Sequence, residues 1–353
     1  MSIFLEKRAQ SSRLLSALVP LLAIVLALLV GAIIIALTGA NPWEAYREMF
    51  VGAFGSGYAL SETIVKTIPL ILCSLGVGIA FRATLWNIGA EGQLYMGAFA
   101  AGGIALAFPQ GQGWWLIPLM VLASLLGGAL WGLIPGLLKA KLNVNEIITS
   151  LLLNYVAILW FQYWIYGPWK DPLGYGFPYT APFGEGAWLP TLAGTRIHLG
   201  LAFAVLAAVF LYFLLKSTRV GYEIRIIGEN AQAARYAGMN IPGTILLVFA
   251  ISGGLAGLAG MGEVSGVIHR LQPAISPGFG YTAIIIAWLS RFNPWLTIAV
   301  SFLFGGLLVG GYSLRAFGLS DSLVLILQGL ILFLLLGGDI LTRYRLRWKG
   351  GRA

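Results

Sequence analysis

Long apolar runs recur along this chain, and they restrict what it can fold into more than any other feature. The first, residues 14–37, is about long enough to cross the hydrocarbon core of a bilayer as a helix. It is also longer than the apolar core of a signal peptide, so we expect it to be retained. Only 10% of the residues are charged, whereas a soluble domain carries about a quarter. We therefore predict an all-α, polytopic transmembrane helical bundle.

We predict about ten crossings, or eight to nine if the short segments re-enter, with the N and C termini both cytoplasmic. With ten crossings, most of the 22 Lys and Arg residues lie on the cytoplasmic side of the membrane. Those on the opposite, outer side are Arg47, Lys66, Lys170, Arg196, Arg270 and Arg315. The positive-inside rule predicts this asymmetry. It explains the formal charge of +9 by topology, without a nucleic-acid partner. We thus expect a multi-pass protein of the inner (cytoplasmic) membrane of a cell.

The predicted boundaries describe one membrane domain over residues 1–353. They are a first span at 14–37, an interfacial helix at 41–56, a first half of the core at 60–166, an extracytoplasmic loop at 167–197, a cytoplasmic loop at 216–240, a second half of the core at 241–338 and a basic tail at 339–353. Within the fourth span, Gly128, Gly132 and Gly136 recur every four residues, which predicts close packing against another helix.

One stretch, residues 81–105, places Asn87, Glu91 and Gln93 among apolar and glycine residues. Polar groups in a bilayer are costly, and they usually mark a cavity or a pathway. A second short segment with glycine, 276–281, lies at a comparable place in the other half, and paired interruptions of this kind indicate a substrate site near the midplane. The alternative is a cytoplasmic loop that precedes an ordinary membrane helix.

We predict a solute pathway from polar and aromatic residues of these segments and of neighbouring span ends. The candidates are Trp86, Asn87, Glu91, Gln93, Tyr95, Asn145, Glu263 and Tyr281. Amides and carboxylates can hydrogen-bond a polar solute, and the rings of Trp86 and Tyr95 can stack on it. Helix packing explains the polar groups equally well, and capping explains Asn145 equally well. The chain has one Cys and two separate His residues, so we predict no metal site.

The segment 216–240 is the most polar part of the interior of the chain. Asn230 can cap a short alanine-rich helix that ends at Gly238. The chain has no phosphate-binding loop of the form G-x-x-x-x-G-K-[ST], so energy for active transport would come from another chain. A helix with small residues on one face suits insertion into a groove of that partner. The alternative is a solvated loop that only obeys the positive-inside rule.

Three stretches resemble the membrane subunits of ATP-binding-cassette importers of the ribose and branched-chain amino acid permease group, in the nucleoside and simple-sugar branch. They are LWNIGAEGQ at 85–93, NVNEII at 143–148, and Gly228-Glu229-Asn230 followed by AARYAG at 233–238. The first two stretches are fairly specific to the branch, and the third is shared more widely. The likeness runs in order over roughly Leu60 to Leu336.

This resemblance implies a set of partners. Two related permease subunits, the same or different, sit on cytoplasmic ATP-binding subunits, and an extracellular lipid-anchored solute-binding protein delivers the solute. ATP and Mg act on the ATPase, and this chain binds no cofactor. The residues carried over as coupling contacts are Arg225, Glu229, Asn230, Ala233, Ala234, Arg235 and Gly238.

The function we predict is a nucleoside permease subunit of an ATP-driven importer, which has no catalytic residues of its own. A simple-sugar importer of the ribose type is the close alternative. An ion-driven secondary transporter is a more distant one, and transport by this chain without an ATPase would identify it. A membrane-embedded enzyme would need a nucleophile and base or a metal cluster, and the sequence contains neither motif.

Overall fold

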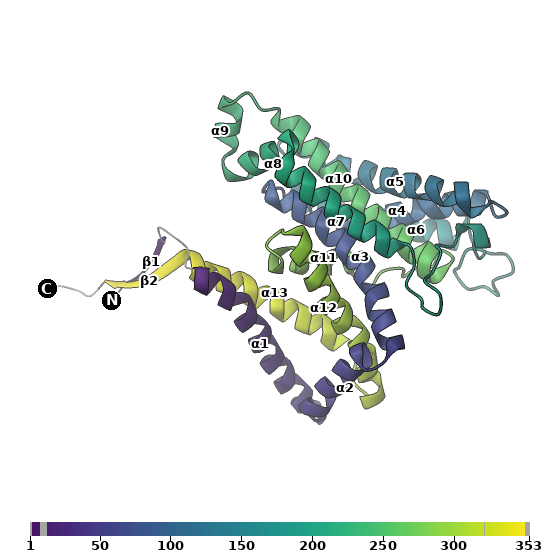
Figure 1. Cartoon of the computed structure of the whole chain (residues 1–353), viewed down its shortest axis with the longest axis horizontal. Coiled ribbons are helices and arrows are strands. Elements are labelled where there is room, and N and C mark those ends of the chain that lie inside the picture. The colour runs from purple at the N-terminus through teal and green to yellow at the C-terminus, as the bar shows by residue number, and fades with distance from the viewer. Residues whose placement is uncertain (1, 8–12, 321, 350–353) are drawn as a thin grey trace. The chain divides into compact units, whose positions relative to one another are not determined.

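The computed structural model describes residues 2–7, 13–320 and 322–349, and these are helical apart from loops and two short strands. The predicted tail residues 350–353 lie outside the described part of the chain. In order, the elements are β1 (Ser2–Lys7), α1 (Arg13–Leu37), α2 (Pro42–Phe54), α3 (Gly57–Arg82), α4 (Ala90–Ala107), α5 (Gly113–Leu142), α6 (Glu146–Tyr166), η1 (Glu185–Ala187), α7 (Gly200–Ser217), α8 (Arg219–Glu229), α9 (Ala231–Tyr236), α10 (Ile241–Glu263), the π-helix η2 (Val264–Ile268), α11 (Phe279–Leu289), α12 (Pro294–Ser313), η3 (Leu314–Phe317), α13 (Ser322–Arg343) and β2 (Tyr344–Lys349) (Figure 1).

Seven helices among the described residues are long and apolar enough to cross a membrane, which makes this an integral membrane protein. They are Leu18–Leu37, Gly57–Arg82, Gly113–Leu142, Glu146–Tyr166, Gly200–Ser217, Ile241–Ile268 and Pro294–Ser313. Two shorter apolar helices are Phe279–Leu289 and Ser322–Gly338. The all-helical body is confirmed, while the count of ten crossings and the orientation of the termini stay predictions.

The contacts of the chain group it into two compact units, residues 57–306 and residues 1–56 with 307–353. In the second of these, β1 and β2 pair antiparallel. A Cβ placed on Gly31 would overlap Leu327 and the Tyr46 hydroxyl, so α1, α2 and α13 approach closely there. α2 begins where we predicted the interfacial helix, and the Asn41 side chain caps it by accepting a bond from the Trp43 amide.

In the unit of residues 57–306, α3 and α10 form the centre. In the most apolar 18-residue stretch of each helix, 89% of the residues of α3 and 78% of those of α10 are buried in the protein, whereas only 22% are buried in α5 and in α6. Helices that are apolar all round lie in a core, so α5 and α6 are left to face lipid or another subunit.

The predicted packing of the glycine stripe on α5 is confirmed, and the helix that it packs against is α10. A Cβ on Gly128 would overlap the Gly253 carbonyl, and one on Gly132 would lie 2.7 Å from the Phe249 carbonyl. Gly97 of α4 meets the backbone of Gly257 in the same way. Small residues let α4, α5 and α10 approach backbone to backbone, which is typical of helices that associate in membranes.

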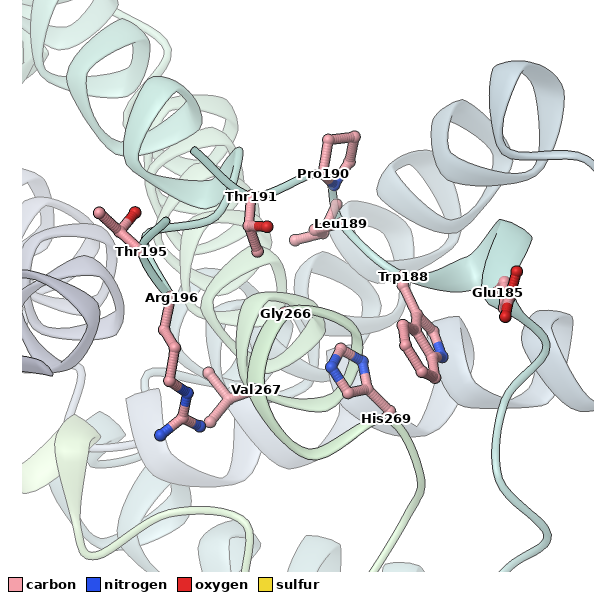
Figure 2. A pocket seen from close by; sticks show the side chains of 10 residues that line it. All are labelled: Glu185, Trp188, Leu189, Pro190, Thr191, Thr195, Arg196, Gly266, Val267 and His269. Carbon is pink, nitrogen blue, oxygen red and sulfur yellow. The ribbon is translucent and has the colours of Figure 1, made fainter. Parts of the chain in front are cut away.

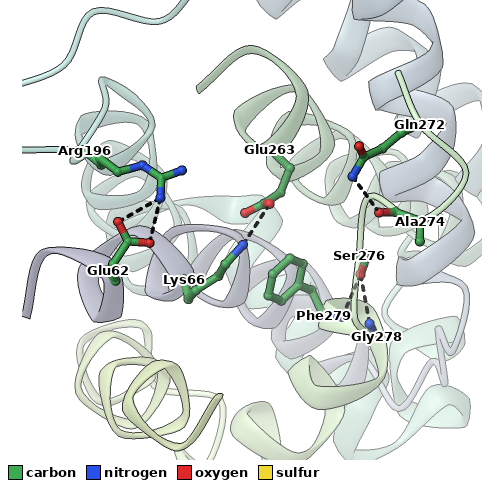
Figure 3. Close-up of polar contacts among 9 residues, drawn as sticks. All are labelled: Glu62, Lys66, Arg196, Glu263, Gln272, Ala274, Ser276, Gly278 and Phe279. Atoms are coloured by element: carbon green, nitrogen blue, oxygen red, sulfur yellow. Dashed lines mark hydrogen bonds and ion pairs between the residues drawn. The ribbon is translucent and has the colours of Figure 1, made fainter. Parts of the chain in front are cut away.

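The segment after α3 is not helical until Ala90. Thr84 adopts a left-handed conformation at φ +55°, which ends α3. Similarly, α11 begins only at Phe279, where the Ser276 hydroxyl accepts bonds from the Gly278 and Phe279 amides (Figure 3). The two segments that we predicted as interruptions are therefore both broken helices.

Candidate functional site

A buried hydrogen-bond network holds the break between α3 and α4. Asn87 Nδ2 donates to Gln93 Oε1 at 3.0 Å and to Ser252 Oγ at 2.8 Å, and Gln93 Nε2 donates back to Asn87 Oδ1 at 3.1 Å. Ser252 lies near the middle of α10, so the broken segment reaches deep into the unit. Each polar group that leaves water here gains a partner in the protein, and the burial penalty is offset.

Two side chains of α6 hold the same segment from the other side. Asn154 Oδ1 accepts a bond from the Gly92 amide at 2.8 Å, and Asn154 Nδ2 donates to the Ile88 carbonyl at 2.9 Å. The Ser150 hydroxyl accepts from the Ile88 amide at 3.1 Å. The backbone groups freed by the helix break are thereby satisfied, as a membrane interior requires. Our list of candidates did not contain Ser150, Asn154 or Ser252.

The two interrupted segments contact each other, and Glu91 joins them. Its carboxylate accepts a bond from the Gly280 amide at 2.7 Å, and a Cβ on Gly280 would overlap the backbone of Glu91. The next residue, Tyr281, receives a bond on its hydroxyl from Asn154 Nδ2 at 3.3 Å. The N-terminal ends of α4 and α11 thus meet beside α6, as expected of paired interruptions around a midplane site.

The predicted pathway residues separate into a buried and an exposed group. Asn87, Glu91 and Gln93 are 0%, 3% and 1% exposed, and their side chains are bonded within the chain. Tyr95 is buried against Phe161, with ring centroids 5.1 Å apart. These side chains shape the site from inside, and any direct contact with a solute would require their present contacts to open.

Trp86 and Tyr281 form the exposed group, and each is 37% exposed. The Trp86 ring stacks on the Trp288 ring, with centroids 5.8 Å apart and an interplanar angle of 29°. The Phe81 ring also packs against Trp86, with centroids 4.9 Å apart. Asn145 is also exposed, but its side chain caps α6 by accepting a bond from the Ile147 amide at 2.9 Å. An exposed aromatic ring such as that of Trp86 can bind a flat molecule by stacking, and an exposed hydroxyl such as that of Tyr281 can hydrogen-bond.

Glu263 lies away from this group, at the end of α10, where it pairs with Lys66. The Lys66 Nζ and Glu263 Oε2 atoms are 3.2 Å apart, and the carboxylate side chain is only 2% exposed (Figure 3). One turn earlier on α3, Glu62 accepts both bonds of Arg196 Nη1 at 3.0 and 3.1 Å. The two pairs tie α3 to α10 and to the loop before α7. Two of the basic residues that we predicted to lie outside are thus at the same end of the unit.

A pocket of about 470 Å³ opens at this end between the loop of residues 185–196 and the turn after η2 (Figure 2). The Trp188 and His269 rings stack there with centroids 4.2 Å apart. Nearby, His198 is buried against Gly266, where a Cβ would overlap the imidazole. Burial, together with the positive charge of Lys66, lowers the pKa of His198 to about 4, so this imidazole is neutral at physiological pH.

The predicted short helix in segment 216–240 is confirmed as α9. The Asn230 side chain accepts bonds from the Gln232 and Ala233 amides, both at 3.0 Å, and Gly238 follows the helix at φ +74°. The two alanines of this helix differ in exposure. Ala234 is fully buried against its own chain, whereas Ala233 is exposed.

The other coupling candidates, Arg225, Glu229 and Arg235, are all exposed around α8 and α9. Tyr236, which we did not select, is 94% exposed at the end of α9. A large aromatic side chain held in water on a short capped helix is typical of a contact with another protein. The sequence AARYAG at 233–238 does not indicate that the Tyr236 side chain is exposed.

Among the described residues, no cluster of three or more His, Cys, Asp or Glu side chains is arranged to hold a metal ion.

Residues 59–336 match the family model described as branched-chain amino acid transport system / permease component. The chain is 40% identical to the glucose ABC transporter permease protein TsgB13 of Haloferax volcanii, over 92% of this chain and 88% of that protein. It is 36% identical to the guanosine ABC transporter permease protein NupP of Bacillus subtilis, over 86% and 87%. It is 31% identical to the nucleoside ABC transporter permease protein NupB of Lactococcus lactis, over 90% and 89%.

Proposed function

Because the chain belongs to the family of branched-chain amino acid transport system permease components and is an ABC transporter permease, we propose that it forms the translocation pathway of an ATP-driven nucleoside importer. A permease subunit is a transport component and not an enzyme. The stacked pair of Trp86 and Trp288 carries the proposal for the solute. A nucleobase has a π-face that stacks on such rings, and the Tyr281 hydroxyl can bond its polar edge or the ribose.

A simple sugar is the second candidate, since aromatic rings also line sites that bind sugars and the glucose permease of Haloferax volcanii is 40% identical to this chain. In both cases the buried network of Asn87 and Gln93 has a supporting role. It keeps the broken segment rigid, so that Trp86 is presented at the surface.

The motor in this proposal is a separate ATPase that binds the ATP and Mg. We place α8 and α9 on the cytoplasmic side, together with both termini, in an inner membrane. The positive-inside distribution of Lys and Arg supports this orientation. The exposed side chains around α9, with Ala233 and Tyr236 among them, form the contact with the ATPase.

The opposite end of the unit then receives an extracellular solute-binding protein, and the pocket beside Trp188 and His269 is open to it.

A second permease subunit would complete the pathway. The outer face of α6 supports this partner, because five of its large side chains are exposed in one helical stripe. They are Ile148, Leu152, Tyr155, Leu159 and Tyr163.

The function is tested by reconstituting the chain in liposomes with the ATPase, permease and binding protein encoded beside it. We expect ATP-dependent accumulation of labelled guanosine or uridine, with an excess of unlabelled glucose causing no inhibition. Inhibition by glucose or ribose, with no nucleoside uptake, would establish the sugar alternative. Uptake driven by a proton gradient without the ATPase would contradict the proposal as a whole.

We predict that Tyr236→Ala lowers the affinity for the ATPase subunit at least about thirtyfold, which corresponds to a hot-spot residue of about 2 kcal/mol. The matched control is Tyr175→Ala, because Tyr175 is 96% exposed on the loop at the other end of the unit. Affinity is measured by biolayer interferometry of the purified subunits. Equal effects of the two variants would remove α9 from the contact.

A further inference from the structure

A pocket in the unit of residues 57–306 lies beneath α9 and has no role in the account so far. Its volume is about 820 Å³, within the range of small-molecule sites. Three parts of the chain line it: the broken segment at 83–85, the corner between α5 and α6, and the segment from the end of α8 to the start of α10. α9, the broken segment and the corner between α5 and α6 therefore all border this pocket.

The lining of this pocket includes polar side chains and carries a net positive charge. Lys139 and Arg235 contribute two cations, and Glu146 contributes the one carboxylate. Lys139 Nζ lies 3.0 Å from Glu146 Oε2, which occupies one of its three N–H donors. Arg235 has no ion pair among the described residues, so the five N–H donors of its guanidinium remain available.

Asn143 adds a third donor group. It ends α5 in a left-handed conformation at φ +51°, and only its backbone amide takes part in that cap. Its side-chain amide makes no hydrogen bond within the described part of the chain and faces the same pocket. An amide, a guanidinium and an ammonium therefore line one pocket, and the Glu146 carboxylate is the one acidic group in its lining.

The lining also contains apolar side chains, those of Ile227, Ile241 and Ile245. A small inorganic anion would leave these side chains in contact with water. A ligand with an anionic head and an organic body would contact both the basic and the apolar residues. Phosphate is the head group that suits Arg and Lys together, since the guanidinium binds it in a bidentate manner and the ammonium adds further N–H donors.

We propose that the pocket beneath α9 binds a phosphate ester, whose phosphate lies between Arg235, Lys139 and the Asn143 amide. Two sources share this chemistry, the head group of an anionic phospholipid and a soluble phosphate metabolite. Basic pockets between membrane helices on the cytoplasmic side are known to take anionic head groups. The bound ester would link α9 to the corner of α5 and α6 and restrain the segment that contacts the motor. The proposal goes beyond transport itself and does not depend on which solute is carried.

The test uses the full chain in nanodiscs of neutral phosphatidylcholine. One arm adds phosphatidylglycerol to the bilayer, with binding read by native mass spectrometry. The other arm adds uridine monophosphate or glycerol 3-phosphate from solution, with binding read by the shift in unfolding temperature. We expect one arm to give saturable binding, and the responding arm identifies the source.

Two substitutions probe the pocket, and two matched ones control for charge. Arg235→Gln and Asn143→Gly are each expected to weaken binding about tenfold or more, and glycine tolerates the left-handed conformation at position 143. Arg225→Gln and Lys141→Gln remove exposed cations that do not line the pocket, and we expect them to change binding less than about twofold. Absence of binding in both arms, or equal weakening by Arg225→Gln, would overturn the proposal.

Discussion

Replacing Lys66 with Met is expected to destabilise the protein by about 3–5 kcal/mol, because it leaves the Glu263 carboxylate buried without its cation. The Glu263 side chain is only 2% exposed, so water cannot take over the role of the ammonium group. The other oxygen, Glu263 Oε1, already makes no hydrogen bond in the described part of the chain. The change is measured as the shift in unfolding of the detergent-solubilised protein, followed by tryptophan fluorescence in rising denaturant.

Two controls separate the loss of the ion pair from the loss of the lysine stem. The double variant Lys66→Met with Glu263→Gln removes both charges, and we expect it to recover most of the stability. Arg219→Met breaks an i,i+4 pair whose arginine is 88% exposed, and we expect a cost below about 1 kcal/mol. If Lys66→Met and Arg219→Met cost the same, the buried pair is not a significant contributor to the fold.

The second large effect is expected from Gly97→Leu, which should prevent α4 and α10 from packing and cost more than about 3 kcal/mol. A Cβ at this position would overlap the Cα and carbonyl of Gly257, and backbone cannot move aside as a flexible side chain can. We expect little folded protein, measured as the monodisperse fraction in fluorescence-detected size-exclusion chromatography. The matched control is Gly329→Leu, because a Cβ on Gly329 would meet nothing within 4 Å. A normal elution profile for Gly97→Leu would contradict the backbone contact.

Features with a local cause could be predicted from the sequence. Apolar length predicts α1 to within one residue, because a crossing needs a run of about twenty residues. The spacing of Gly128, Gly132 and Gly136 predicts a packing face, and Asn230 followed by alanines predicts the cap of α9. Each of these signals lies within a few turns of one helix.

Features that depend on distant partners could not be predicted. The Lys66–Glu263 pair joins residues 197 positions apart, so Glu263 had no basic neighbour in sequence. The network of Asn87 depends on Ser252, which is 165 positions away, and no local pattern marks that serine. Exposure of Tyr236 and burial of Ala234 follow from how α9 rests on α8 and α10, which is a tertiary property. A lysine inside an apolar run was the one available signal, since intramembrane charges usually have a partner.

The glycine contacts of α4, α5 and α10 have a mechanical consequence. Where the main chains of two helices are in contact, no flexible side chains lie between them that could rearrange and let one helix slide past the other. We therefore expect the three helices to tilt together as one rigid group. Only residues 237–240 separate α9 from α10, so a displacement of α9 would be passed on to this group. We expect the hinges of any gating movement at the end of the group, where the segment before α4 and the start of α11 meet through Glu91 and Gly280.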